Sequence, residues 1–258
     1  MTDELNPIER IPVYDAEAND TAMTDSFEAR FGNMDFRCSR MTWLSLFFLL
    51  IVYPGVSLAF MEDPSLVLGN LNAGMLMVLL VSTIVMQWGI FLVLYMSLYL
   101  ENTGLTGLGF KRIRGIDFAW AISFLVASNM ILAGLAWFLA QVGLPMPGEI
   151  AMLIPTDTTG RIVWVLVSFT AGFCEESMFR GYIMTRLRLV GRFKSWVIPT
   201  IASSLAFGAC HAYQGLPGLI VITTYGLLFA LLYIRTGSIW PCIIAHFFQD
   251  FSALFIPQ

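Results

Sequence analysis

Long runs of apolar residues are the feature that most constrains how this chain can fold. A helix that crosses a lipid bilayer needs roughly 20 mostly apolar residues. Stretches close to that length occupy 41–60, 73–100, 118–142, 161–187, 196–212, 219–234 and 238–255. Hydrophobic residues make up 57% of the 258-residue chain and charged residues only 12%, a balance foreign to ordinary soluble domains. The sequence therefore predicts an all-α integral membrane protein with about seven transmembrane helices.

The fifth and sixth predicted helices form one long uncharged run, divided at "YQGLPG" (213–218) because Gly-Leu-Pro-Gly favours a turn. Lysine and arginine residues then orient the helices. They precede the first helix and recur after the second, fourth and sixth, while the first and fifth connections contain none. By the positive-inside rule the N-terminus is cytoplasmic and the C-terminus lies outside. We expect a multi-pass protein of the bacterial inner membrane, in contact with membrane lipid.

The first 40 residues differ from the rest of the chain. They hold half of the 18 acidic residues and show no sustained helical period. Such a composition cannot bury enough apolar surface to fold, so 1–40 is predicted to be a disordered cytoplasmic tail. No basic block suggests a nucleic-acid partner.

Ionisable side chains inside three of the predicted helices indicate a functional site. Each costs about 2.5–3.5 kcal/mol at mid-bilayer on insertion scales, so such residues tend to be functional. They are Glu175, Glu176 and Arg180 in the fourth helix, His211 in the fifth, and His246 and Asp250 in the seventh. With a rise of about 1.5 Å per residue from the cytoplasmic ends, Glu175, His211, His246 and Asp250 lie roughly 12–22 Å deep. The sequence thus predicts one polar layer built from three helices.

The local spacing indicates pairs within this layer. Glu176 and Arg180 are four residues apart, so they share a helix face and can form an ion pair. Glu175 is turned by about 100° and can face another partner. His246 and Asp250 also share a face, where the carboxylate could fix the imidazole tautomer or contact a substrate directly.

Two chemistries fit these side chains. In one, a glutamate takes the proton of a water that attacks a peptide carbonyl, while imidazoles orient the water or stabilise the oxyanion. In the other, a zinc ion bound by candidates among His211, His246, Glu175 and Asp250 lowers the pKa of the water. Both lead to hydrolysis, and the residues leave the choice between them open.

Three short motifs in this order resemble the CPBP intramembrane proteases, the family of CAAX prenyl proteases, Abi proteins and bacteriocin-processing proteins. "EESMFR" is similar to its Glu-Glu-x-x-x-Arg motif, "FGACH" to Phe-x-x-x-His, and "HFFQD" to His-x-x-x-Asn/Asp. The third motif ends in Asp rather than the Asn of CAAX-trimming relatives. The resemblance divides the membrane part into N-terminal helices (41–157) and a catalytic core (158–258).

The resemblance implies a helical core that opens toward the cytoplasm and cleaves a membrane-associated or prenylated peptide. Glu175 would be the general base and His211 would help hold the water. His246 and Asp250 would stabilise the oxyanion or contribute to a metal site, while Glu176 and Arg180 support the first motif.

Two other functions remain as alternatives. One is a non-catalytic membrane scaffold that retains the protease fold and regulates a partner or confers bacteriocin immunity. The other is a proton- or cation-coupled transporter, in which buried Glu, His and Asp relay ions. Filled motif positions favour the protease over the scaffold. The absence of a matching polar set in the first half of the chain disfavours the transporter.

Overall fold

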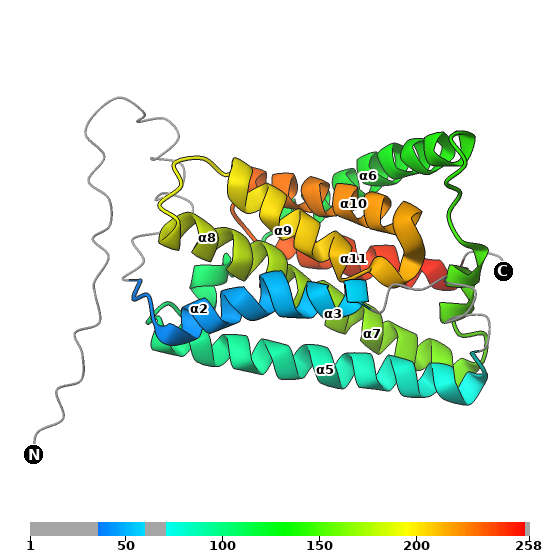
Figure 1. The fold of residues 1–258 in the computed structure, drawn as a ribbon, viewed down its shortest axis with the longest axis horizontal. Coiled ribbons are helices and arrows are strands. Elements are labelled where there is room, and N and C mark those ends of the chain that lie inside the picture. Colours follow the sequence, from blue (N-terminus) through cyan, green and yellow to red (C-terminus); the bar gives the residue numbers. More distant parts are fainter. Residues whose placement is uncertain (1–35, 60–70, 256–258) are drawn as a thin grey trace, which may run out of the picture.

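A computed structural model describes residues 36–59 and 71–255 of the chain. Within these ranges the secondary structure is helical, and no strand occurs. The long elements are α2 (Arg40–Phe47), α3 (Tyr53–Ala59), α5 (Ala73–Leu100), α6 (Gly115–Gln141), α7 (Thr158–Glu176), α8 (Thr185–Val190), α9 (Val197–Ala209), α10 (Gly215–Thr236) and α11 (Trp240–Ser252). π-Helical turns at Phe48–Val52 and Ser177–Met184 join α2 to α3 and α7 to α8 (Figure 1). Most of the predicted disordered tail, 1–35, lies outside the described residues.

Every predicted membrane segment contains a helix, but not every helix is long enough to cross a bilayer alone. Five of those described are long and apolar enough: Arg40–Ala59, Ala73–Leu100, Gly115–Gln141, Thr158–Val190 and Ala212–Thr236. α9 and α11 have 13 residues each. At 1.5 Å per residue they extend about 20 Å, short of a hydrocarbon core about 30 Å thick. The all-α membrane fold is confirmed, whereas the count of seven spans is not.

The predicted break between the fifth and sixth helices is present, but the turn lies earlier than expected. α9 ends at Ala209, and a 3₁₀ turn at Ala212–Gln214 leads into α10. Gly215 has φ +72°, a conformation that side chains with a Cβ rarely adopt, and Gly-Leu-Pro-Gly forms the first turn of α10. Proline is tolerated there because that backbone N–H has no partner within the helix. His211 consequently lies in the turn after α9, where the sequence predicted helix.

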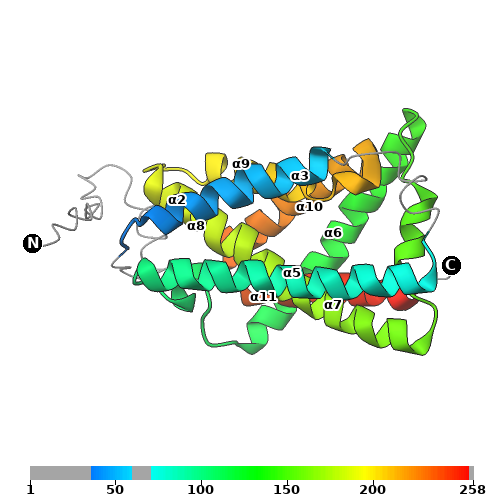
Figure 2. The same ribbon diagram turned by 60° about the horizontal axis from the view of Figure 1, so that its bottom comes forward.

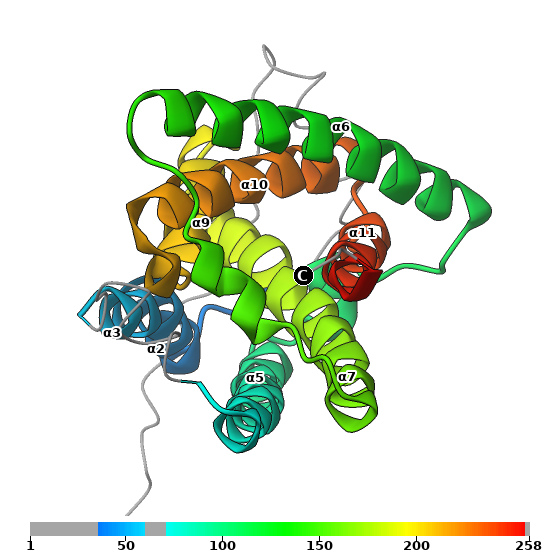
Figure 3. The same ribbon diagram turned by 90° about the vertical axis from the view of Figure 1, so that its right-hand side faces the viewer.

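α7 runs through the centre of the bundle. Viewed end-on, it is surrounded by α5, α11, α10 and the α2–α3 rod, while α6 lies across the far side of α10 and α11 (Figure 3). In the most apolar part of the span Thr158–Val190, which contains α7, 56% of the residues are buried, against 11% in the corresponding part of α6. α7 packs directly on α5 and on α11, and α9 packs on α10 (Figure 2). The central position buries the polar residues of α7 among neighbouring helices.

A close helix crossing sets the distance between α7 and α11. A Cβ placed on Gly172 would lie 2.9 Å from the carbonyl oxygen of Ile243 and 3.0 Å from the backbone nitrogen of Phe247. Only glycine lets the two backbones approach so closely. The crossing brings the polar residues of α11 against those at the end of α7.

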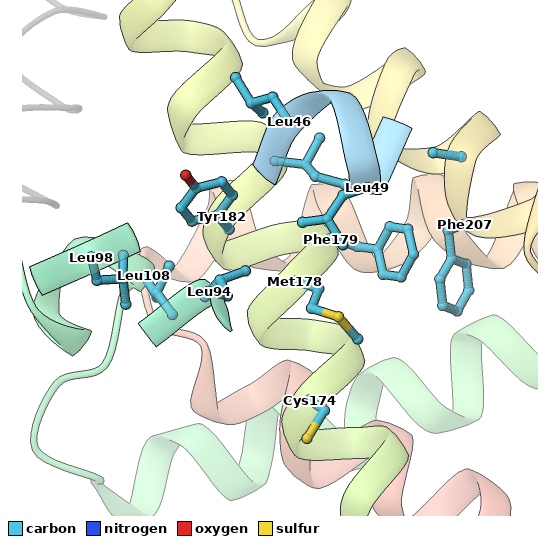
Figure 4. Close-up of a cluster of buried hydrophobic side chains, with 12 residues drawn as sticks. Leu46, Leu49, Leu94, Leu98, Leu108, Cys174, Met178, Phe179, Tyr182 and Phe207 are labelled. Atoms are coloured by element: carbon cyan, nitrogen blue, oxygen red, sulfur yellow. The ribbon is translucent and has the colours of Figure 1, made fainter. Parts of the chain in front are cut away.

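A hydrophobic cluster packs along one side of this central helix (Figure 4). It combines side chains from α2, α5, α7, α9, the π-helical turns Phe48–Val52 and Ser177–Met184, and a 3₁₀ turn at Leu105–Leu108: Leu46, Leu49, Leu94, Leu98, Leu108, Cys174, Met178, Phe179, Tyr182, Ile183, Ala206 and Phe207. Cys174 is fully buried here, and Cys242 is fully buried in a second cluster on α10 and α11. Both thiols serve as small packing groups.

A buried polar network lies where α5, α2 and α8 meet. Glu101 and Arg186 have no exposed side-chain surface and form an ion pair at 2.8 Å. The hydroxyls of Thr42, Ser97 and Tyr182 all donate to the same oxygen of Glu101, at 2.8, 3.1 and 2.7 Å. Arg186 also donates to the Gly107 carbonyl and to Thr103 and Thr185. The network ties the end of the central helix to α5 and α2.

The end of the predicted disordered tail reaches this network. Phe36 is buried, and the backbone N–H of Arg37 donates to the Glu101 carbonyl at 3.1 Å. Ser39 caps α2 by accepting a hydrogen bond from the backbone of Thr42. Residues 36–39 are therefore packed against the bundle, contrary to the sequence prediction, because they complete the hydrogen bonding of Glu101 and α2.

Candidate active site

Glu175 and Glu176 end the α-helical part of the central helix, and a π-helical turn, Ser177–Met184, follows directly. π-Helical turns are rare and often coincide with functional sites. The side chains of Glu175 and Glu176 are 11% and 0% exposed, so both carboxylates need partners within the protein.

Glu176 is held by two partners on one oxygen. Its Oε1 accepts from Nη1 of Arg180 at 2.8 Å, which confirms the pair that the i, i+4 spacing predicted. The same oxygen lies 2.8 Å from Nδ1 of His246 on α11. A carboxylate only accepts hydrogen bonds, so Nδ1 carries a proton. Glu176, not Asp250, is the residue that orients the His246 ring.

The other nitrogen of His246 faces the remaining acids. Nε2 lies 4.0 Å from Oε2 of Glu175 and 3.6 Å from Oδ2 of Asp250. Both distances exceed a direct hydrogen bond. A gap of this size between polar groups commonly holds a bridging water. Asp250 thus lies on the open side of the imidazole, in position to contact a water or a substrate.

Arg180 is buried without snorkelling to the surface. Its guanidinium lies between two rings, 4.2 Å from the centroid of Phe207 and 4.9 Å from that of Phe229. Nη2 donates to the Gly226 carbonyl at 3.4 Å. Cation–π contacts and the ion pair together compensate for burying the charge. Arg180 therefore fixes Glu176, which in turn fixes His246.

Glu175 has a partner that the sequence analysis missed. Nε2 of Gln87, in the middle of α5, donates to Oε1 of Glu175 at 2.6 Å. Gln87 is 3% exposed. The signal in the sequence is an uncharged amide inside an otherwise apolar run, which a criterion of ionisable side chains does not include. Oε2 of Glu175 has no hydrogen-bond partner.

His211 lies apart from the carboxylates. Its Nδ1 is 2.9 Å from the Phe207 carbonyl, which can only accept, so this nitrogen also carries a proton. The ring of Phe207 packs against both histidines, and its centroid lies 4.9 Å from that of His211 and 6.2 Å from that of His246. In the described part of the chain, no hydrogen bond or ion pair joins His211 to the acids. The structure brings together the other five predicted site residues and leaves His211 at the margin, with Nε2 not engaged by the Phe207 contact.

The site opens on the Asp250 side. The Asp250 side chain is 31% exposed, against 7% for His246 and 0% for Glu176. Trp164 on α7 donates to the Asp250 carbonyl at 2.9 Å and holds this turn of α11 in place. Exposure therefore increases across the polar cluster, from the buried ion pair of Glu176 to the accessible carboxylate of Asp250.

Binding of zinc at this site stays a prediction. Within residues 36–59 and 71–255, no group of three or more His, Cys, Asp or Glu side chains could hold a metal ion. Nδ1 of His246 contacts Glu176 and Nδ1 of His211 contacts the Phe207 carbonyl, so only the Nε2 atoms of the two imidazoles are left for other partners. We derive no step through a metal.

A comparison with known protein families finds a match for the C-terminal part of the chain. Residues 157–252 match the model described as "Rce1-like: Type II CAAX prenyl endopeptidase Rce1-like". After this match we call residues 157–252 the Rce1-like domain. No curated protein and no solved structure matches the chain.

The Rce1-like domain contains all six predicted site residues, and the resemblance stated from the three motifs is confirmed. In general terms the match indicates a CAAX-protease-like endopeptidase that resides in a membrane and acts on a membrane-associated peptide. Gln87 lies outside the Rce1-like domain, on a helix that the family model does not cover.

Proposed function

We propose that the protein hydrolyses a peptide bond of a membrane-associated, CAAX-type substrate with a water activated by Glu175. The observation that supports this most is the 4.0 Å separation between Oε2 of Glu175 and Nε2 of His246, two buried polar atoms without a direct hydrogen bond between them. A water there would contact the general base on one side and an oriented imidazole on the other.

In the proposed reaction Glu175 removes a proton from the water as its oxygen attacks the carbonyl carbon of the scissile bond. The π electrons of the carbonyl move onto its oxygen. His246 would stabilise this oxyanion as an imidazolium, in which Nδ1–H donates to Glu176 and a second proton on Nε2 is donated to the oxyanion. When the tetrahedral intermediate collapses, the C–N bond breaks and Glu175 returns its proton to the leaving amine.

The remaining residues have supporting roles in this scheme. Arg180 holds Glu176, and Glu176 holds the tautomer and orientation of His246. Asp250 lies at the open side and would contact the water or the substrate backbone. His211 would reach the reaction only if a substrate or a water extends to its Nε2.

We further propose that the basic ends of α8 and α10 face the cytoplasm of a bacterial cell. Arg188 stacks on Trp196 at 4.6 Å, and Arg235 on Trp120 at 5.4 Å. Arginine–aromatic pairs of this kind suit the membrane–water interface, and the positive-inside rule assigns that interface to the cytoplasmic side.

The test is cleavage by purified protein in detergent, with a prenylated CAAX peptide and a mixed peptide library as substrates. Glu175→Gln keeps the size of the side chain and removes the base, so we expect a loss of at least about 10²-fold in kcat. Glu149→Gln makes the same chemical change in the α6–α7 connection and should leave cleavage unchanged. Each reaction is repeated with 1,10-phenanthroline, and unchanged rates are expected.

Two results would contradict the proposal. Cleavage by Glu175→Gln at the wild-type rate would remove the general base from the scheme. A folded wild-type protein that cleaves neither substrate, while Glu175→Gln retains its function in cells, would favour the non-catalytic scaffold. Inhibition by the chelator would replace the metal-free mechanism with a metal-dependent one.

A further inference from the structure

Gln87 occupies a position where a polar side chain is expensive. It lies in α5, a 28-residue apolar helix, and faces the bundle interior with 3% exposure. Burying an amide without hydrogen bonds costs several kcal/mol, so such a residue needs a partner. The only side-chain hydrogen bond of Gln87 to the described residues is the 2.6 Å contact from its Nε2 to Oε1 of Glu175.

The amide and the carboxylate each leave one oxygen unsatisfied. Oε1 of Gln87 and Oε2 of Glu175 are both buried, and neither has a hydrogen-bond partner. Both atoms are acceptors only, so they cannot satisfy one another. Each buried acceptor left alone costs about 1–3 kcal/mol. The pair therefore presents two acceptors that need donors from a third molecule.

Water is the smallest molecule that meets this requirement. It has two O–H groups, and one molecule can donate to both acceptors at once. Buried waters usually make about three hydrogen bonds to groups that lack partners. With both hydrogens engaged, the lone pairs of the oxygen would face away from the amide–carboxylate pair, which is the geometry that attack on a carbonyl carbon requires.

We propose that Gln87 is a further catalytic residue, which holds the attacking water through Oε1 and orients the general base Glu175 through Nε2. The inference rests on the proposed function and extends it beyond the Rce1-like domain, because the water site is completed by a helix outside residues 157–252. Gln87 thereby makes α5 part of the active site.

A purely structural role for Gln87 would be to tie α5 to α7, and the chain offers a matched control for that role. The neighbouring Trp88 also ties α5 to α7, since its Nε1 donates to Oγ1 of Thr170 at 3.1 Å. Trp88 has no hydrogen bond to the acids or histidines of the site. Trp88→Phe removes an interhelical hydrogen bond while leaving the water site intact.

The experiment compares wild type, Gln87→Met and Trp88→Phe as purified full-length proteins on the same cleavable peptide. Gln87→Met keeps the length of the side chain and removes both hydrogen-bonding groups. We expect kcat to fall about 10²-fold with KM within about threefold, since an interaction with the reacting water is lost and substrate binding is not. Trp88→Phe should keep kcat within about threefold. The thermal unfolding temperature of each variant measures how much the lost hydrogen bond between α5 and α7 stabilises the fold.

The outcomes separate the inference from the proposed function. If Glu175→Gln is inactive while Gln87→Met cleaves with wild-type kcat, Gln87 is only a tie and the inference is wrong. If Glu175→Gln cleaves like wild type, the proposed function itself fails. Should Gln87→Met not fold, Gln87→Asn decides, because it keeps the amide but is one methylene too short to reach Glu175. Wild-type kcat in Gln87→Asn would overturn the proposal.

Discussion

Replacing Glu101 by Gln should test how much the buried network at the end of α5 stabilises the fold. Glu101 and Arg186 are both 0% exposed, and two nitrogens of Arg186 lie 2.8 and 2.9 Å from one oxygen of Glu101. Glu101→Gln keeps the shape and removes the negative charge, so Arg186 becomes a buried cation without a counter-charge. Removing one partner of such a pair costs about 3–5 kcal/mol.

That loss corresponds to an unfolding equilibrium shifted by roughly 10²- to 10⁴-fold, since about 1.4 kcal/mol is a factor of ten. The hydrogen bonds of Arg186 to the Gly107 carbonyl and Thr103 remain, so the loss arises from the charge. Reversible unfolding in mixed detergent micelles, followed by circular dichroism, gives the free energy of unfolding for each variant.

Two variants control the interpretation. Arg114→Gln removes an ion pair with Asp117 that is 4.0 Å long and has an Arg114 side chain 63% exposed, and it should cost at most about 1 kcal/mol. Glu101→Gln combined with Arg186→Gln leaves no unpaired charge and should cost less than the sum of the single changes. A loss in Glu101→Gln no larger than in Arg114→Gln would refute the reasoning.

Two further predictions follow from packing and exposure. Gly172→Leu should destabilise the protein by about 1–3 kcal/mol and abolish cleavage, because its side chain would collide with the backbone of Ile243 and Phe247 and move α11 off α7; wild-type cleavage would contradict this. Burial, with a smaller contribution from the charge of Glu101, raises the pKa of the half-buried Cys38 thiol, so its alkylation by iodoacetamide should accelerate about tenfold per pH unit between pH 7 and 9. Mass spectrometry should find the fully buried Cys242 unmodified throughout. A rate at Cys38 that levels off between pH 8 and 9 would show that the pKa of this thiol is not raised.

The helices were predictable because the bilayer leaves few alternatives. Runs of apolar residues near bilayer length can only be spanning helices or buried ones, and all seven predicted segments are helical. Whether a short apolar helix crosses the membrane depends on its length, which depends on where it ends. The end of α9 is set by the turn before Gly215, with positive φ, and not by the hydropathy of the run.

The candidate site was predicted where spacing within one helix decides the contact, as for Glu176 and Arg180. The contact of Glu176 with His246 depends on how α7 crosses α11, and no local pattern encodes that crossing angle. The predicted depth along the helix axis gave no information on the direction of the His211 side chain. Its ring turns toward the Phe207 carbonyl.

Glu101 and Gln87 were missed for different reasons. Glu101 stands at the end of an apolar run and is followed by Asn-Thr-Gly, a pattern that predicts the start of an exposed loop. Its burial results from Arg186, which arrives from a position 85 residues later. Gln87 carries no charge, so its cost in an apolar helix is easy to overlook in a sequence.

The π-helical turn Ser177–Met184 separates two polar clusters carried by one continuous helix. Glu175 and Glu176 precede it, and Arg186 follows it, so the winding of these eight residues sets the rotation between the active site and the Glu101 network. Deleting a single residue there would turn one cluster by about 100° relative to the other. Substitutions in this turn can be absorbed by packing, but a change in its residue count cannot. Relatives that conserve both clusters should therefore vary in the composition of this segment and never in its length.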